Sequence, residues 1–384
     1  MKHRRINILF VLPSLRYTGA ETQAVNLING LSRRKFNIHA VIFQDHLDQL
    51  AKLDTRTITF YMCPRRFKFD TAIIKKIADI IRREDIRIIH CTNQIAFLFA
   101  FLGRLISGRK SALVATLHTT IHRSVKNEIF DRLLYSPLMI FANRIITVSR
   151  NQKRHWIKKY PWLAKRMVTI HNGVDVDAFR DRMTHDRREV LREKLHLRPE
   201  DFVVVLAAEF RPEKGHDTAF MAVNKVKRQG KNIKLVLLGD GEKTDELRTL
   251  ARQLHMEEDI RWEGYQKDIR PYLGICDVVL ISSFAESFSM TMLEAMAAGR
   301  PVISTRVGGA DELIVESRNG MLVEPGDPNP MGEALEFMIA NADLCLKMGQ
   351  SARDSVVREY EVGRMVEKTA VLLEGMIPNG DNHG

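Results

Sequence analysis

Two glutamates separated by eight positions mark a segment that could bind a ligand. Residues 286–294 read Glu-Ser-Phe-Ser-Met-Thr-Met-Leu-Glu and follow a short apolar run at 278–281. The pattern predicts a helix that starts one to three residues after Glu286 and stops at Gly299. The unpaired backbone amides of a helix start favour an anion such as a diphosphate. The two carboxylates would flank it, and each can accept paired hydrogen bonds from sugar or ribose hydroxyls.

The elements that must position this segment alternate between short apolar runs and stretches with helical periodicity. The runs lie at 6–12, 38–43, 87–90, 113–117 and 144–148 in the first half, and at 202–207, 234–238, 260–262, 278–281, 301–304 and 321–323 in the second. Strands that alternate with helices imply parallel order. We therefore expect an α/β protein with two Rossmann-like, doubly wound domains, which bind ligands at the carboxyl ends of their strands.

The expected domain boundaries follow from breaks in this pattern. A first domain spans residues 1–175, a charged linker 176–200 and a second domain 201–356. A helix at 357–377 is expected to pack back on the first domain, and the tail at 378–384 is expected to be disordered. A chain of 384 residues is long enough for two such cores.

Composition and charge narrow the class of protein. The four cysteines show no CxxC spacing and no apolar run is long enough to span a membrane, so we expect neither a disulfide framework, a zinc site nor a transmembrane segment. The charge is uneven, because residues 1–180 contain 32 Lys and Arg against 12 Asp and Glu while the whole chain has a net charge of +12. A basic half can meet nucleic acid, an anionic membrane or an acidic substrate.

The segment at 286–294 and its surroundings resemble the retaining nucleotide-sugar glycosyltransferases of family four, also described as glycosyl transferases group 1. The matching segments, in the family's order, are Ile-His-Asn-Gly-Val-Asp at 170–175, Arg-Pro-Glu-Lys-Gly at 211–215, Glu-x7-Glu at 286–294, Arg-Pro-Val-Ile-Ser-Thr at 300–305, Val-Gly-Gly-Ala-Asp-Glu at 307–312 and Asn-Gly-Met-Leu-Val-Glu-Pro-Gly-Asp at 319–327. The resemblance implies the GT-B fold, whose two domains face each other across a cleft. The first domain would bind the acceptor and the second the nucleotide sugar.

The resemblance also implies roles for residues of the second domain. Glu286 would contact the transferred sugar and Glu294 the ribose of a UDP-sugar or GDP-sugar. Backbone amides for the phosphate or sugar oxygens would come from Ser287, Phe288, Ser289 and Met290. Lys214 would stabilise the diphosphate as it leaves, a role that can replace a metal ion. Family members usually carry an arginine five residues before this lysine; this chain has Glu209 there, and we expect Arg211 to reach the phosphate instead.

Two residues of the first domain complete the predicted site. Thr-Gly-Ala-Glu at 18–21 stands where relatives have Gly-Gly-x-Glu, a loop whose backbone closes on the donor phosphates or the acceptor. Gly19 is the residue that would permit this close approach. His118 follows the apolar run at 113–117 and matches a histidine that relatives place beneath the donor sugar, although a purely structural role is the alternative.

No metal ion or other cofactor is expected besides the nucleotide sugar itself. His90, His171 and His216 lack ligand spacing to another His or Cys. Metal-dependent sugar transferases of the other major fold use an Asp-x-Asp motif, but the Asp-x-Asp of this chain, at 175–177, begins at the last residue of the 170–175 motif. The resemblance implies retention at the anomeric carbon through front-side displacement. In that reaction the departing phosphate helps to deprotonate the acceptor hydroxyl.

The acceptor is expected to be a glycan or a lipid-linked molecule. Residues 121–170 contain eleven Lys or Arg, with Trp156, Tyr160 and Trp162 interleaved, which suits the headgroup zone of an anionic membrane. This predicts a cytoplasmic enzyme bound peripherally to the inner face of the plasma membrane, in cell-surface polysaccharide or lipopolysaccharide biosynthesis. A solvated basic face is the alternative.

Two other functions stay open at this level. A sugar-nucleotide epimerase of similar fold would use the same diphosphate site. A non-catalytic nucleic-acid-binding protein would explain the net charge, but no recognition motif is present and the second half is acidic. The expected activity therefore does not involve nucleic acid.

Overall fold

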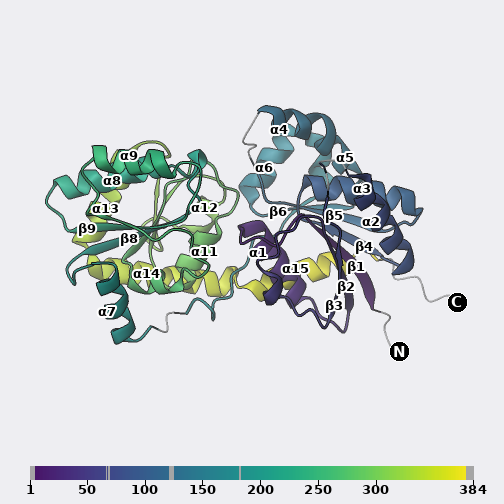
Figure 1. Cartoon of the computed structure of the whole chain (residues 1–384), viewed down its shortest axis with the longest axis horizontal. Helices are drawn as coiled ribbons and strands as arrows, with labels where there is room; N and C mark the ends of the chain where they lie inside the picture. Colours follow the sequence, from purple (N-terminus) through teal and green to yellow (C-terminus); the bar gives the residue numbers. More distant parts are fainter. Residues whose placement is uncertain (1–4, 66, 68–69, 121–124, 181–182, 378–384) are drawn as a thin grey trace. The chain divides into compact units, whose positions relative to one another are not determined.

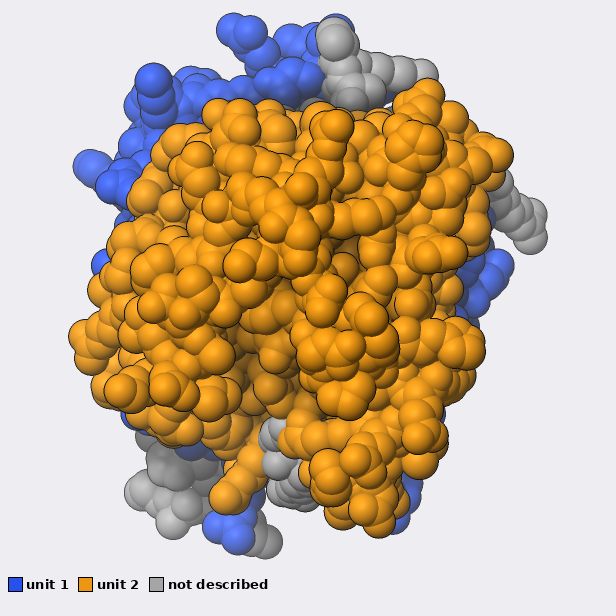
Figure 2. Space-filling model, turned by 90° about the vertical axis from the view of Figure 1, so that its left-hand side faces the viewer, with its two compact units in different colours: residues 1–173, 362–384 blue, residues 174–361 orange. Residues whose placement is uncertain are grey.

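The computed structural model describes residues 5–65, 67, 70–120, 125–180 and 183–377, which fall into two compact units (Figures 1 and 2). Unit 1 comprises residues 1–173 and 362–384, and unit 2 comprises residues 174–361. The tail predicted to be disordered, 378–384, lies outside the described residues.

Unit 1 is built on a seven-stranded parallel sheet with the order β3-β2-β1-β4-β5-β6-β7. Its strands are β1 (Ile6–Leu12), β2 (Phe36–Ile42), β3 (Ile58–Met62), β4 (Ile88–Cys91), β5 (Ala112–Leu117), β6 (Arg144–Thr147) and β7 (Met167–Thr169). Ile8 pairs in register with Ile38 on one side and Ile88 on the other, so a layer of buried side chains crosses the sheet. The nearly unbroken apolar runs arise because helices cover both faces of the sheet.

The helices of unit 1 form two layers (Figure 1). They are α1 (Gly19–Gly30), η1 (Leu50–Lys52), α2 (Thr71–Arg83), α3 (Gln94–Ser107), α4 (Val125–Phe130), η2 (Asp131–Tyr135), α5 (Ser136–Leu138), η3 (Met139–Phe141), α6 (Arg150–Lys159), η4 (Pro161–Arg166) and α15 (Val362–Glu374). Helices α2 and α3 pack on one face, and α1 and α15 pack on the other. Helix α15 contacts α1 closely, since a Cβ added at Gly30 would lie 2.5 Å from Cγ2 of Val366.

Unit 2 contains a six-stranded parallel sheet with the order β10-β9-β8-β11-β12-β13. Its strands are β8 (Phe202–Ala207), β9 (Ile233–Leu238), β10 (Ile260–Trp262), β11 (Val278–Ile281), β12 (Val302–Thr305) and β13 (Met321–Val323). Its helices are α7 (His185–Lys194), η5 (Pro212–Lys214), α8 (His216–Arg228), α9 (Thr244–Gln253), α10 (Arg270–Ile275), α11 (Met290–Ala297), α12 (Ala310–Leu313), α13 (Pro328–Ala340) and α14 (Ala342–Glu359). The strand order reverses between β8 and β11, and such a switch point is where doubly wound sheets bind ligands.

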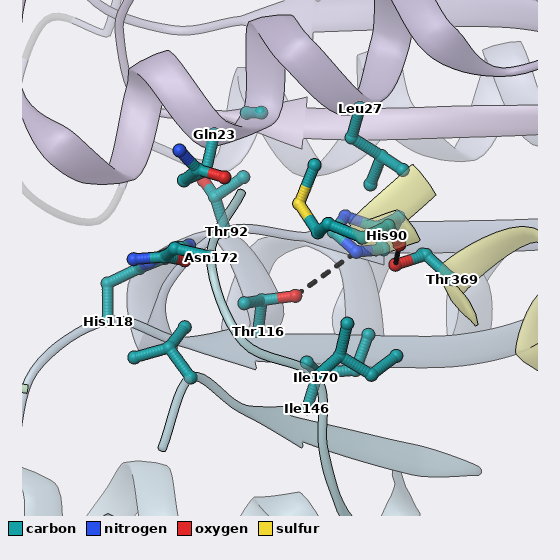
Figure 3. A pocket seen from close by; sticks show the side chains of 13 residues that line it. Gln23, Leu27, His90, Thr92, Thr116, His118, Ile146, Ile170, Asn172 and Thr369 are labelled. Carbon is teal, nitrogen blue, oxygen red and sulfur yellow. Dashed lines mark hydrogen bonds between the residues drawn. The ribbon is translucent and has the colours of Figure 1, made fainter. Parts of the chain in front are cut away.

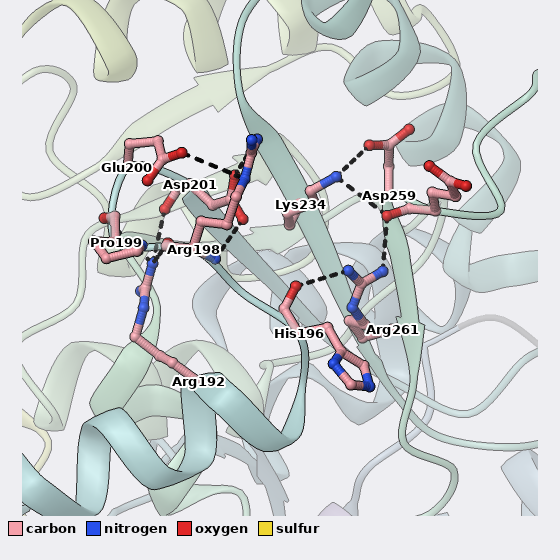
Figure 4. A network of polar contacts seen from close by, with 10 residues as sticks. Arg192, His196, Arg198, Pro199, Glu200, Asp201, Lys234, Asp259 and Arg261 are labelled. Carbon is pink, nitrogen blue, oxygen red and sulfur yellow. Dashed lines mark hydrogen bonds and ion pairs between the residues drawn. The ribbon is translucent and has the colours of Figure 1, made fainter.

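The charged segment expected to be a linker, 176–200, is instead part of unit 2. Arg192 of α7 donates hydrogen bonds to the carbonyl oxygens of Arg198 and Asp201, and Arg261 of β10 donates to the carbonyl of His196 (Figure 4). Arg188 also donates to the carbonyl of Gly274. The many charged side chains favoured the prediction of a linker. In the structure, several of them donate hydrogen bonds to backbone carbonyls and so fix α7 to the rest of unit 2.

Candidate functional site

Lys214 and Glu286 meet at the switch point of unit 2. Lys214 ends η5, which follows β8, and Glu286 lies in the loop between β11 and α11. The lysine Nζ is 2.5 Å from Oε1 of Glu286, and the Ser283 hydroxyl donates to the same oxygen at 3.1 Å. The two charged side chains remain 24% and 17% exposed. A cation and a carboxylate are therefore both within reach of a ligand at the carboxyl ends of β8 and β11.

Hydroxyl groups directly after β11 and at the end of β12 hold these loops together. Ser282 Oγ donates to the carbonyl of Lys214 at 2.9 Å, and Thr305 Oγ1 donates to the carbonyl of Ser283 at 2.6 Å. Ser282 and Ser283 were not predicted to belong to the site, and Thr305 was noted only as the last residue of the 300–305 motif. The available signal was the serine pair directly after a buried strand, where side chains reach the ligand edge of a parallel sheet.

Two glycines allow the backbone to approach this site. Gly215 has φ +60°, and a Cβ there would lie 2.2 Å from the carbonyl oxygen of Ser282. Gly308 has φ +57°, and a Cβ there would lie 2.3 Å from the carbonyl oxygen of Glu286. Any side chain would collide with backbone at either position, and both backbone conformations favour glycine.

Helix α11 begins at Met290, slightly later than the predicted start between 287 and 289. Ser289 stays extended and accepts a hydrogen bond from the Met292 amide at 3.3 Å, so it caps the helix instead of joining it. Ser287 and Phe288 are buried, and the Phe288 ring packs against Tyr360 with centroids 5.7 Å apart. The Phe288 side chain thus belongs to the core. Glu294, the fifth residue of the helix, is half-buried.

Arg211 lies at the start of the loop that carries Lys214. Its guanidinium forms an ion pair with Glu209, the residue at the position where the family usually has arginine. Lys214 donates its backbone amide to the carbonyl of Arg211 at 3.0 Å, which folds this loop into η5. The structure thus brings Arg211 and Glu209 together next to the lysine.

In unit 1, His118 follows β5 and lines a cavity at the carboxyl ends of β4 to β7 (Figure 3). The polar residues that line the cavity are Gln23, His90, Thr92, Thr116, His118, Asn172 and Thr369. His90 Nε2 lies 3.1 Å from Thr116 Oγ1, while its buried Nδ1 has no hydrogen-bond partner among the residues that the structure describes. Burial lowers the pKa of His118 to about 4 and, together with repulsion from His118, that of His90 to about 3. Both rings are therefore neutral at pH 7. His90 was not predicted to belong to this site.

Gly19 is the first residue of α1. Glu21, two residues later, accepts hydrogen bonds from the hydroxyls of Ser14, at 3.0 Å, and Thr18. The Thr-Gly-Ala-Glu segment is thus a helix start whose carboxylate is held by the residues before it.

The aromatic part of the proposed membrane-facing segment needs correction. Trp156 and Tyr160 are each only 2% exposed, and the Tyr160 hydroxyl donates to Asp131 at 3.0 Å. Both rings belong to the core, where Trp156 of α6 and Tyr160, which directly follows that helix, pack in one cluster with residues of the sheet. Only Trp162 of the three is exposed, at 54%, whereas Leu133 and Phe141 supply exposed apolar surface that sequence analysis missed. Arg123, one of the eleven cations, lies outside the described residues.

Comparisons with known proteins agree with this two-part organisation. The family profile described as Glycosyltransferase Family 4 matches residues 17–178, and that described as Glycosyl transferases group 1 matches residues 187–355. The N-acetyl-alpha-D-glucosaminyl L-malate synthase of Bacillus anthracis is 26% identical over 322 residues, which cover 82% of this chain and 81% of that protein. The lipopolysaccharide core biosynthesis glycosyltransferase LpsE of Rhizobium meliloti is 32% identical over 182 residues, 47% of this chain and 52% of that protein.

Among solved structures, Anabaena Alr3699/HepE in complex with UDP-glucose matches with a TM-score of 0.84 at 22% identity. The match covers 97% of this chain and all of that one, so both share the arrangement of two parallel sheets with helices. Since successive parts of the sequence match the two glycosyltransferase profiles, the chain belongs to the group 1 glycosyltransferases of family four and has their GT-B fold.

Proposed function

We propose that this glycosyltransferase is a retaining, metal-independent enzyme that moves a sugar from a UDP-sugar or GDP-sugar to a glycan or lipid-linked acceptor. The observation that carries the proposal is the Lys214–Glu286 pair beside the start of α11. This place offers an ammonium group and helix-start amides to a diphosphate, and a carboxylate to sugar hydroxyls. The Anabaena structure with UDP-glucose supports a UDP-sugar as the first donor to test.

In the proposed reaction, the bond from the anomeric carbon to the diphosphate oxygen breaks while a bond to the acceptor oxygen forms on the same face. The leaving diphosphate takes the acceptor proton, and Lys214 stabilises its charge, assisted by Arg211. Glu286 and His118 would hold the transferred sugar, and Glu294 the ribose. The remaining donor contacts would be backbone amides of Gly19, Ser287, Phe288, Ser289 and Met290.

The acceptor side of the proposal rests on an apolar and basic surface of unit 1. Its exposed apolar residues are Ile129, Leu133, Ile140, Phe141 and Trp162, on α4, η2, η3 and η4. Its exposed cations include Arg132, Arg144, Lys158 and Lys165. Among the described residues, no helix has both the length and the apolar character to cross a membrane. We propose that this surface binds anionic lipid at the cytoplasmic face of the plasma membrane, and the LpsE relative supports a role in cell-surface polysaccharide or lipopolysaccharide biosynthesis.

Binding and product analysis together test the proposed activity. Thermal-shift measurements with UDP, GDP and their sugars should show stabilisation by one nucleotide series, and Glu294→Ala should reduce it. Transfer should continue in EDTA and keep the donor's anomeric configuration. A product that appears without any acceptor would favour the epimerase, whereas no stabilisation by any nucleotide diphosphate would remove the donor-site assignment.

A further inference from the structure

Phe284 is an exposed aromatic residue that none of the assigned roles explains. It lies in the loop between β11 and α11, two residues before Glu286, and is 43% exposed. Ser282 and Ser283 on one side of it and Ser287 on the other are buried. Single exposed apolar side chains are common on protein surfaces, so the exposure of Phe284 does not by itself give it a role. Its position is what distinguishes it, because it lies in the same loop as Glu286.

The ring of Phe284 is fixed between two glycines. A Cβ added at Gly215 would lie 3.3 Å from its Cε2 atom, and one added at Gly326 would lie 3.3 Å from its Cε1 atom. Its backbone amide also donates to the carbonyl of Glu213 at 2.8 Å. Because these neighbours hold both the ring and the backbone, the exposed part of the ring has a defined orientation.

The same contacts place the ring at the rim of the donor site. Gly215 directly follows Lys214, and Glu213 directly precedes it, so Phe284 touches the loop on both sides of the lysine. The Lys214 and Glu286 side chains are less exposed than Phe284, at 24% and 17%. A ligand held by these two charges would therefore have the aromatic ring beside its outer part.

We propose that Phe284 stacks on the apolar face of a pyranose ring and helps to determine which sugar is used. The face of an aromatic ring is electron-rich and attracts the positively polarised C–H groups on one face of a pyranose. The inference rests on the proposed glycosyl transfer, which supplies such rings in two places, the transferred sugar of the donor and the end of the acceptor. Both present the same chemistry to Phe284.

Calorimetry and kinetics on full-length Phe284→Ala and Phe284→Tyr test this role. The probes are UDP, UDP-glucose and, as a simple acceptor, octyl β-glucopyranoside. Phe284→Ala should leave UDP affinity unchanged but weaken either UDP-glucose binding or acceptor saturation by roughly 3- to 10-fold. The first result assigns the ring to the donor sugar and the second to the acceptor sugar. Phe284→Tyr should restore the wild-type value in either case.

Phe337→Ala is the matched control, because Phe337 is 38% exposed on α13 of the same unit and should change none of these values. The proposal is overturned if Phe284→Ala matches wild type with both sugars, or if it loses UDP and UDP-glucose affinity equally. If the wild-type protein binds GDP instead of UDP, the same comparison is made with GDP and GDP-glucose. A wild-type protein that binds neither nucleotide would instead overturn the proposed function, and the stacking role with it. Melting temperatures of the variants separate these outcomes from misfolding.

Discussion

Lys214 Nζ lies 2.5 Å from Oε1 of Glu286, so the cation proposed for the diphosphate is paired with the carboxylate proposed for the sugar. Ser283 donates to the same carboxylate oxygen and holds it in place. We expect a diphosphate to compete with Glu286 for the lysine. Once Lys214 has turned to the phosphate, the carboxylate is released to accept hydrogen bonds from sugar hydroxyls, so the two halves of the donor would bind interdependently.

This competition predicts opposite effects for the two partners. Glu286→Gln should tighten UDP binding, because it removes a negative charge and a rival for Lys214, while it slows sugar transfer. Lys214→Ala should weaken UDP binding about tenfold or more, since a hydrogen bond to a charged group contributes roughly 1.5–3 kcal/mol. Calorimetric titration with UDP measures both changes.

The control for this prediction is Lys225→Ala. Lys225 of α8 pairs with Glu333 of α13 at 3.5 Å, an ion pair at the surface of the same unit. Its loss should not alter UDP affinity. If Glu286→Gln binds UDP no better than wild type, the competition between carboxylate and diphosphate does not exist.

Replacing Gly308 should destabilise the protein more than its left-handed backbone conformation alone would explain. Gly308→Ala would press a methyl group against the carbonyl of Glu286, where a Cβ lies only 2.3 Å from the oxygen. Gly230→Ala imposes a similar left-handed strain, at φ +79°, but meets nothing within 4 Å. We expect Gly230→Ala to cost about 1 kcal/mol of unfolding free energy, and Gly308→Ala to cost more and also to reduce donor affinity. Urea unfolding and UDP titration of the two variants provide the comparison, and equal behaviour would count against the role of Gly308.

Much of the arrangement of the proposed donor site could be predicted from sequence because it is local. Glu286, Glu294 and the helix between them lie within one continuous segment, and the strand before it reads as an unbroken apolar run. The close approach of Gly308 to the Glu286 backbone could not be predicted in the same way, because these two residues are neighbours only in the folded structure. The same holds for the Thr305 hydroxyl that supports Ser283.

Two strands also escaped prediction for identifiable reasons. β7, Met167–Thr169, directly follows Lys165 and Arg166 and lies inside the basic stretch at 121–170, which was interpreted as a membrane-facing segment. β3 reads Ile-Thr-Phe-Tyr-Met, in which a threonine and a tyrosine interrupt the apolar residues, and only Ile58 of this edge strand is buried. The burial of Trp156 was missed because half of the residues of α6 are basic, although Gln152 and Trp156 of this helix are buried.

Because Arg211 forms an ion pair with Glu209, we expect Arg211 to take the role of the arginine that the family usually has at the position of Glu209. Arg211→Ala should then weaken UDP binding, and Glu209→Arg added to it should restore much of the affinity by returning the cation to its usual place. Glu209→Arg with Arg211 intact should bind UDP at least as well as wild type. UDP titrations of the three variants decide the question. Wild-type affinity in Arg211→Ala would show that the arginine serves only its ion pair with Glu209.

The neutral histidines of unit 1 predict a loss of stability in acid. Their pKa values are lowered from 6.5 to about 4 for His118 and about 3 for His90, so between pH 6.5 and 4 the unfolded chain binds more protons than the folded one. Each histidine then lowers the free energy of unfolding by up to about 1.4 kcal/mol for every pH unit of acidification. Urea unfolding of wild type and His90→Gln should give parallel curves above pH 7 and a shallower decline for the variant below pH 6.5. Identical slopes in acid would contradict the burial of a neutral His90.

The apolar and basic surface of unit 1 predicts binding to anionic vesicles. Wild-type protein should sediment with vesicles containing phosphatidylglycerol at low salt, less so as salt screens the cations, and not with pure phosphatidylcholine. Leu133→Asp should weaken sedimentation about tenfold or more, because burying a leucine side chain in the interface contributes roughly 1.5–3 kcal/mol. Leu346→Asp on α14 is the matched control, since the two leucines are 74% and 70% exposed. UDP affinity should be the same in all three proteins, because neither substitution touches the Lys214–Glu286 site. Equal sedimentation of the two variants would show that Leu133 does not enter the membrane interface. A wild type that does not sediment with anionic vesicles at low salt would leave the basic residues as a solvated face, and the acceptor would then have to be sought among water-soluble glycans.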